Sequence, residues 1–223
     1  MVPFTPVVLL RLVSRNEMGS YLQGSILKAR DSLLEKSFLF LRRFKPVRER
    51  VTPGQYNDHV EREHVARYRF ARQFCAGKRV ADIACGSGYG SAILAEVAAG
   101  VDSYDKEPLC GNRLIDLERE SWDMAYDVVV SFETIEHLAN PAFFLANASR
   151  TANLLIVSTP VGEFRGYNPH HKQVWTLSQF RRLLETYFEC TYYYQDGEEI
   201  RSDPAGSIRF VIGVGMPKLV SHV

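Results

Sequence analysis

A strand pattern, a glycine-rich turn and a helix pattern follow one another directly near the middle of this chain, and together they constrain its fold strongly. Residues 79–84 are mostly apolar, residues 85–90 contain three glycines, and residues 91–99 have the apolar spacing of a helix. Glycine suits such a turn because it permits sharp bends and lets a ligand approach the main chain. A glycine-rich turn alone can also be purely structural. The whole pattern predicts an α/β fold with a parallel sheet.

Short apolar segments alternate with helical patterns through most of the chain. We expect strands at residues 79–84, 101–105, 113–117, 126–132, 153–158, 190–194 and 207–214, and helices at residues 58–75, 91–99, 141–149 and 177–188. This alternation predicts a doubly wound, mostly parallel sheet of seven strands with helices on both faces. A polar loop separates the last two strands, and a hairpin there would make one edge strand antiparallel.

The first 50 residues differ from the rest of the chain in charge. Residues 1–50 carry a net charge of +6, and the remaining residues carry a net charge of −5. Residues 25–44 place apolar side chains near helical spacing, which predicts a basic amphipathic helix. We therefore expect a helical extension over residues 1–50 and a main domain over residues 51–223. The apolar face fits packing against the domain or a second copy in a homodimer, and the cations fit peripheral contact of residues 25–45 with an anionic membrane.

Composition limits the classes of function. The net charge of +1 argues against a dedicated nucleic-acid-binding protein. No segment approaches the roughly 20 apolar residues of a membrane span, and we expect no signal peptide. The four cysteines form no C-x-x-C pair, which indicates a reducing compartment. These features predict a cytoplasmic protein, with peripheral membrane contact as an alternative.

Three acidic residues lie at the carboxyl ends of predicted strands: Asp82, Asp105 and Asp116. Open α/β sheets bind their ligands at that edge. Asp105 follows Gly88 by 17 positions, where a carboxylate can accept both hydroxyls of a ribose. Asp116 can meet the exocyclic amine of a purine, and Leu117 can cover its face. These positions predict a nucleoside site.

The glycine spacing distinguishes between nucleoside cofactors. A dinucleotide site usually reads G-x-G-x-x-G, whereas Gly86, Gly88 and Gly90 place the third glycine one position early. The carboxylate of Asp82 would repel a phosphate but suits an ammonium or sulfonium group. A nicotinamide oxidoreductase is therefore disfavoured.

With these features, residues 48–217 resemble the class I S-adenosylmethionine-dependent methyltransferases, and the segment DIACGSGYG is the most specific part of the resemblance. The resemblance implies a Rossmann-like methyltransferase fold with S-adenosyl-L-methionine as cofactor. The cofactor contacts that it implies are Asp82, Ala84, Gly86, Ser87, Gly88, Asp105, Lys106, Asp116, Leu117 and Phe132. Asp116 follows Asp105 by only 11 positions, so we expect an almost bare connection between those two strands.

The segment ahead of the glycine turn looks like that of small-molecule and glycan O-methyltransferases found with glycosyltransferases. This resemblance implies that His64, Arg67 and Tyr68 close over the cofactor. The guanidinium of Arg67 could hold the cofactor carboxylate through two parallel hydrogen bonds. Alternatively, His64 and Tyr68 belong to one face of a packed helix.

Three ionisable residues follow the fourth predicted strand: Glu133, Glu136 and His137. Such groups are costly to desolvate at the end of a central strand unless they serve a purpose. Their Glu-x-x-Glu-His pattern is similar to that of ubiquinone-biosynthesis O-methyltransferases, which implies a divalent ion, Mg²⁺ or Zn²⁺, on these three residues. Alternatively, His137 acts as a general base, or it caps or bridges Glu133.

A long loop over residues 161–174 carries polar groups, among them Asn168, His170 and His171. Long loops between core elements are often functional, and these groups suit a sugar or polyol; an ordinary surface loop is the alternative. The sequence therefore predicts methyl transfer to a hydroxyl of a small molecule, with a sugar or glycan favoured and His137, Glu133 and His170 as catalytic residues. The alternatives are a quinone, phenol or lipid-like acceptor and, in a different class, a non-catalytic nucleoside-binding partner subunit.

Overall fold

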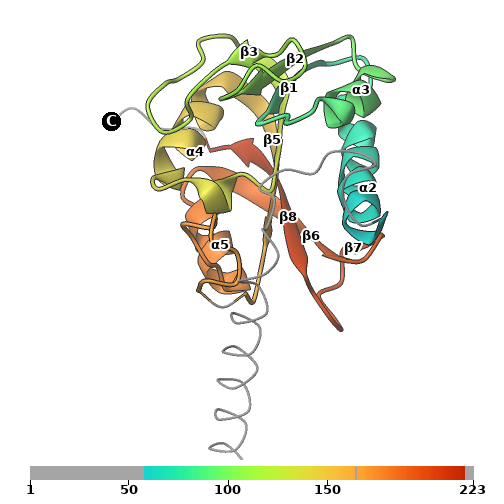
Figure 1. Ribbon diagram of the computed structural model, residues 1–223, viewed down its shortest axis with the longest axis vertical. Coiled ribbons are helices and arrows are strands. Elements are labelled where there is room, and N and C mark those ends of the chain that lie inside the picture. The colour runs from blue at the N-terminus through green and yellow to red at the C-terminus, as the bar shows by residue number, and fades with distance from the viewer. Residues whose placement is uncertain (1–57, 164, 219–223) are drawn as a thin grey trace, which may run out of the picture. The chain divides into compact units, whose positions relative to one another are not determined.

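The computed structural model describes residues 58–163 and 165–218, which contain one sheet with helices on both faces (Figure 1). The predicted extension over residues 1–50, with its membrane-contact segment, lies outside the described residues. The strands are β1 (Arg79–Ile83), β2 (Gly100–Asp105), β3 (Arg113–Leu114), β4 (Tyr126–Phe132), β5 (Ala152–Pro160), β6 (Phe188–Asp196), β7 (Glu199–Arg201) and β8 (Phe210–Pro217). The helices are α2 (Asp58–Cys75), α3 (Tyr89–Ala95), α4 (Pro141–Thr151), α5 (Leu177–Leu184) and the short 3-10 helix η1 (Ile135–His137). Within the described part of the chain, no helix combines the length and apolar character that a membrane span needs.

The sheet has eight strands in the order β3-β2-β1-β4-β5-β8-β6-β7. The first five are parallel, whereas β8 runs antiparallel to both β5 and β6, and β7 runs antiparallel to β6. The α/β architecture is confirmed, but the prediction of seven strands is wrong. Strand β7 has only three residues, too few to leave a periodic pattern in the sequence. Strand β8 lies inside the sheet, where Gly213 makes room for α5, since a Cβ there would stand 2.5 Å from Leu184.

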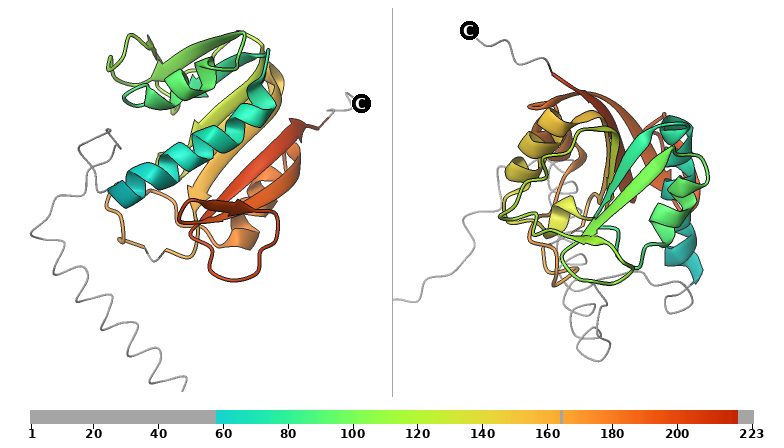
Figure 2. Two further views of the ribbon diagram at one scale, coloured as in Figure 1. Left: turned by 90° about the vertical axis from the view of Figure 1, so that its right-hand side faces the viewer. Right: turned by 90° about the horizontal axis from the view of Figure 1, so that it is seen from above.

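Different helices cover the two faces of the sheet (Figures 1 and 2). Val128 of β4 packs on the face that holds Leu94 of α3, and its neighbour Val129 packs on the face that holds Phe144 of α4 and Phe180 of α5. Successive side chains of a strand point to opposite faces, so a central strand of a doubly covered sheet is apolar at nearly every position. This explains why β4 was recognisable as a continuous apolar segment.

Two neighbouring strands end in an uncommon backbone conformation at one edge of the sheet. Ala84 directly follows β1 with φ 61°, and Glu133 directly follows β4 with φ 49°. Left-handed φ values cost energy in residues with a side chain, and they cluster at functional sites. Because β1 and β4 are parallel, both residues lie at the carboxyl edge of the sheet, where Asp105 also ends β2.

Candidate functional site

A cavity of about 640 Å³ opens at this carboxyl edge, beside the ends of β1, β2 and β4. All three predicted catalytic residues line it: Glu133, His137 and His170. Eight predicted cofactor contacts line it as well: His64, Ala84, Gly86, Asp105, Lys106, Asp116, Leu117 and Phe132. The four predicted cofactor contacts that are not among the lining residues are Arg67, Asp82, Ser87 and Gly88. The cavity volume lies within the usual range of small-molecule binding sites.

The carboxylate of Asp105 joins the end of β2 to the glycine turn. Its Oδ2 accepts the backbone N–H of Gly86 at 3.0 Å, and its Oδ1 accepts the backbone N–H of Glu107 at 3.1 Å. The side chain is buried in the cavity wall. Main-chain donors fix its orientation, while a carboxylate has further acceptor positions that can take hydroxyl groups. This geometry fits the ribose contact expected from the sequence.

Asp82 lies behind the turn instead of in the cavity wall. Its Oδ2 accepts the hydroxyl of Ser91 at 2.6 Å, and its Oδ1 accepts the hydroxyl of Tyr68 at 3.2 Å. Burial raises the pKa of Asp82 to about 6, although these two hydrogen bonds act in the opposite direction. The side chain therefore ties β1 to α2 and α3, in contrast to the predicted contact with the methionine part of the cofactor.

Arg67 also differs from its predicted role. Its guanidinium is fully buried, forms an ion pair with Glu133, donates to Gln195 Oε1 at 2.6 Å and lies 4.3 Å from the ring centre of Phe210. Burial lowers the pKa of Arg67 to about 10, so the group remains protonated at neutral pH. A carboxylate of the same chain thus forms the ion pair that the sequence predicts for the cofactor carboxylate.

His64 extends this network along α2. Its Nε2 lies 3.1 Å from Glu133 Oε1, and its Nδ1 lies 2.5 Å from the hydroxyl oxygen of Tyr89. Burial, reinforced by the charge of Arg67, holds the pKa of His64 well below its usual range, so its ring is neutral at pH 7. Two residues of α2 therefore engage Glu133.

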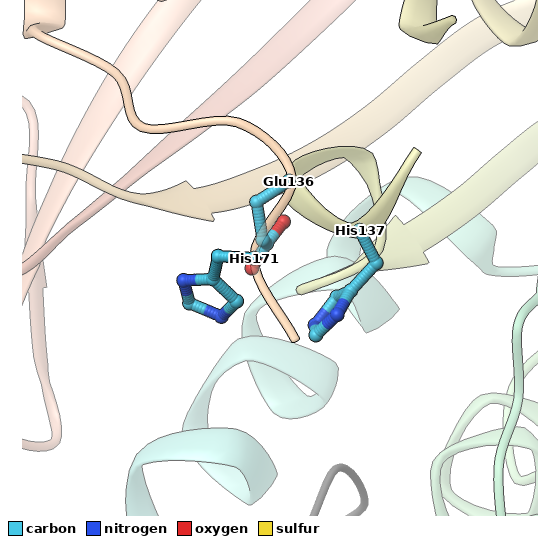
Figure 3. A group of neighbouring side chains, drawn as sticks. All are labelled: Glu136, His137 and His171. Atoms are coloured by element: carbon cyan, nitrogen blue, oxygen red, sulfur yellow. The ribbon is translucent and has the colours of Figure 1, made fainter. Parts of the chain in front are cut away.

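The structure brings together a different set of possible metal ligands from the predicted one. Glu136, His137 and His171 each place one ligand atom within 4.8 Å of those of the other two (Figure 3). Glu133 is engaged by Arg67 and is not part of this group. His171 comes from the loop over residues 161–174, which has no periodic pattern, so the sequence could not assign it to the cluster.

An ion pair between two unpredicted residues connects this loop to the segment after β3. Lys172 Nζ lies 2.7 Å from Glu118 Oε1, and the same oxygen accepts the backbone N–H of Ala139 at 2.7 Å. The predicted site residues nearest to Glu118 in the sequence are Asp116 and Leu117, which directly precede it. Tyr68, expected to close over the cofactor, and the polar loop residues Asn168 and His171 also line the cavity. The remaining lining residues, which the sequence did not single out, are Val60, Cys85, Tyr89, Ile115, Thr134, Leu138 and Pro169.

Two curated proteins that are similar in sequence share one description. A Mycolicibacterium smegmatis protein named "Probable S-adenosylmethionine-dependent methyltransferase" is 32% identical over 162 residues, which cover 62% of this chain and 62% of the relative. A Mycobacterium tuberculosis protein with the same description is 30% identical over 160 residues, covering 61% of this chain and 58% of the relative. The chain thus spans less than two thirds of the length of these curated relatives. No protein-family model matches the chain.

Similar solved structures define the class of fold. A Haloferax volcanii methyltransferase, solved with the Trm112 methyltransferase activator, superposes with a TM-score of 0.61 at 15% identity, covering 74% of this chain and 93% of that chain. The N-methyltransferase NodS of Bradyrhizobium japonicum, solved with S-adenosylhomocysteine, gives a TM-score of 0.55 at 13% identity, covering 73% and 89%. The chain has the Rossmann-like fold of class I S-adenosylmethionine-dependent methyltransferases, with a mixed sheet of eight strands.

Proposed function

We propose that this chain transfers a methyl group from S-adenosylmethionine to a hydroxyl oxygen of a small molecule, with a sugar or another polyol as acceptor. One observation carries the proposal. A single cavity is lined both by Asp105, whose carboxylate is oriented by the backbone N–H of Gly86, and by His137 and His170. The description of the sequence relatives and the class of fold support the choice of cofactor.

The cofactor end of the cavity lies at the ends of β1 and β2. Asp105 accepts the ribose hydroxyls there, and Gly86 lets the ligand approach the main chain. Asp116 and Leu117 line the part of the cavity after β3, where the apolar side chain of Leu117 can cover a purine. S-adenosylmethionine, when bound, supplies a methyl group that its sulfonium already activates.

The residues of the acceptor end have two tasks, to align the hydroxyl and to remove its proton. His137 and His170 are the proposed proton acceptors. Nδ1 of His137 lies 3.1 Å from the backbone carbonyl oxygen of His170. A carbonyl can only accept a hydrogen bond, so this contact places the proton on Nδ1 and leaves Nε2 as the basic atom of the neutral ring.

The loop over residues 161–174 supports a polar acceptor. Asn168, His170 and His171 line the cavity from this loop, and Asn168 Nδ2 lies 2.9 Å from His171 Nε2. Such donors and acceptors match the hydroxyl groups of a sugar better than the face of a quinone. Phenol, quinone and lipid-like acceptors are the competing outcomes of the test below.

Calorimetric titration with S-adenosylhomocysteine and, separately, with NAD⁺ tests the cofactor. We expect heat from the first ligand only, and absence of that heat would overturn the proposal. Transfer of a radiolabelled methyl group from S-adenosylmethionine to a panel of sugars, polyols, phenols and quinols then tests the acceptor. Label in a phenol alone would replace the sugar, and cofactor binding without any transfer would favour a non-catalytic binding protein.

A further inference from the structure

We infer that Glu136, His137 and His171 form a binding site for a divalent transition-metal cation of the Zn²⁺ type. The three side chains come from η1 and from the loop over residues 161–174, and they converge beside the cavity, which His137 and His171 line (Figure 3). This set shares two residues with the trio expected from the sequence but replaces Glu133 by His171.

The first support is the burial of Glu136. Its side chain is fully buried, and Oε2 accepts the hydroxyl of Thr159 at 3.2 Å. Oε1 is also buried and has no hydrogen-bond partner among the described residues. An unpartnered carboxylate oxygen in the interior is costly, and a cation removes that cost. In Figure 3 the carboxylate points toward the two imidazole rings.

The second support is the hydrogen bonding of the two histidines. Nδ1 of His171 lies 2.7 Å from Glu163 Oε2, and Nδ1 of His137 lies 3.1 Å from the carbonyl oxygen of His170. Both partners are acceptors, so the tautomer that fits these contacts has the proton on Nδ1 and a lone pair on Nε2 of each ring. Histidines that bind metals usually donate their other N–H to a carboxylate or a backbone carbonyl in this way.

The third support is the spacing of the cluster. The ligand atoms lie within 4.8 Å of one another, whereas ligands around one Zn²⁺ with bonds of about 2.1 Å lie about 3.4 Å apart. Small side-chain rotations that move the ligand atoms by roughly 1 Å would bring them to the spacing around one Zn²⁺. His171 Nε2 meets the amide nitrogen of Asn168 at 2.9 Å, so binding exchanges one donor for the cation.

The chemistry of the ligands selects the cation. Two imidazoles with one carboxylate suit Zn²⁺, Co²⁺, Fe²⁺ or Ni²⁺, whereas Mg²⁺ prefers oxygen ligands alone. Three protein ligands leave at least one coordination position open. With a divalent cation bound, Nε2 of His137 would hold the cation and the pKa of a coordinated acceptor hydroxyl would fall, so His170 would remain as the proton acceptor.

Metal binding is measured on the full metal-free chain without S-adenosylmethionine, so the result is independent of the proposed methyl transfer. We expect one equivalent of Zn²⁺ in competition with a chromophoric chelator, no displacement by millimolar Mg²⁺, and visible absorption bands of bound Co²⁺. Glu136→Gln and His171→Ala should each weaken Zn²⁺ binding at least a hundredfold, and Glu163→Gln about tenfold. Failure to bind Zn²⁺ would overturn the inference.

His59→Ala is the matched control because it removes a half-exposed imidazole of α2 outside the cluster. This variant should retain the Zn²⁺ affinity and Co²⁺ spectrum of the unmodified chain. Circular dichroism establishes that each variant is folded, and His171→Gln replaces His171→Ala if the latter unfolds. Zn²⁺ binding that is equal in the control and in folded Glu136 and His171 variants would also overturn the inference.

Discussion

The carboxylate of Asp105 accepts the backbone N–H of Gly86 at 3.0 Å, which links the end of β2 to the turn after β1. The two strands are parallel neighbours, with Ile83 of β1 in register with Tyr104 of β2. The same carboxylate therefore orients the glycine turn and borders the cavity. Any ligand that reaches both elements therefore contacts a wall in which the carboxylate and the main chain of the turn hold each other in place.

Replacement of Asp105 by Ala should weaken S-adenosylhomocysteine binding about a hundredfold, since it removes charge-assisted hydrogen bonds to the ribose. Isothermal titration calorimetry measures the change. Asp102→Ala is the control, because Asp102 lies on the same strand in contact with Arg79 and Arg113, outside the cavity lining. Equal affinities of the Asp105 variant and the control would remove Asp105 from the proposed cofactor site.

Replacement of His137 by Ala should lower turnover at least a hundredfold and leave cofactor affinity nearly unchanged. His137 lines the cavity beside His170, at the end that we assign to the acceptor, so its loss affects proton removal and not ribose binding. Steady-state kinetics with the identified acceptor, together with calorimetry, separates the two effects. His59→Ala should behave like the unmodified chain, and unaltered turnover of the His137 variant would exclude His137 from the mechanism.

The ion pair between Arg67 and Glu133 predicts strong coupling in a double-mutant cycle. Arg67 is fully buried, so Glu133→Gln leaves its charge without this carboxylate and should cost about 3 kcal/mol in the free energy of unfolding. Arg67→Met should cost a similar amount, and the double variant should lose clearly less than the sum. Urea denaturation provides the values.

The exposed pair of Arg62 and Glu198 is the control for this cycle. Their side chains lie 2.8 Å apart but are 54% and 55% exposed, so water screens the interaction and little coupling is expected. Equal coupling in the two cycles would show that burial of Arg67 adds nothing to its interaction with Glu133.

Replacement of Gly90 by Ala should destabilise the fold by about 2 kcal/mol, although Ala is the better helix former. An added Cβ would stand 2.0 Å from the ring of Tyr68, which is buried and held by its hydrogen bond to Asp82. Thermal unfolding measures the loss. A Cβ at Gly100 meets nothing within 4 Å, so Gly100→Ala serves as control, and equal stabilities would contradict the packing argument.

The strands that the sequence predicts best are those buried on both faces. The predicted strand over residues 126–132 has the same bounds as β4, because both of its faces require apolar side chains. Strand β3 was expected over residues 113–117 but pairs only at Arg113–Leu114, on the exposed edge of the sheet. Short edge strands obtain little from burial, so their pattern is weak.

The location of the site follows from the sequence, but the direction of its side chains does not. Parallel strands share an edge, which is enough to place Asp105 and Glu133 near each other. Arg67 donates to Gln195, a residue 128 positions away, and no sequence pattern links these two residues. His171 likewise joins Glu136 and His137 through a loop whose path only the tertiary structure specifies.

Asp82 predicts a pH dependence of stability with a definite sign. Burial raises its pKa from 3.8 to about 6, so the folded chain holds this proton more tightly than the unfolded chain. Its contribution to stability is therefore complete below about pH 3.8 and is lost as pH rises through about 6. Asparagine cannot ionise, but it can still accept the hydrogen bond from Ser91.

Relative to the unmodified chain, Asp82→Asn should thus gain up to about 3 kcal/mol in the free energy of unfolding between about pH 4 and pH 7. Urea denaturation at a series of pH values measures the free energy of unfolding of both chains. Groups that the two chains share titrate alike in both, so their effects cancel in the difference. The same substitution at exposed Asp123 is the control for the loss of one carboxylate from the chain. A constant difference for Asp82→Asn over this range would mean that Asp82 titrates alike in the folded and unfolded chains, and that burial behind the glycine turn does not disfavour its charge.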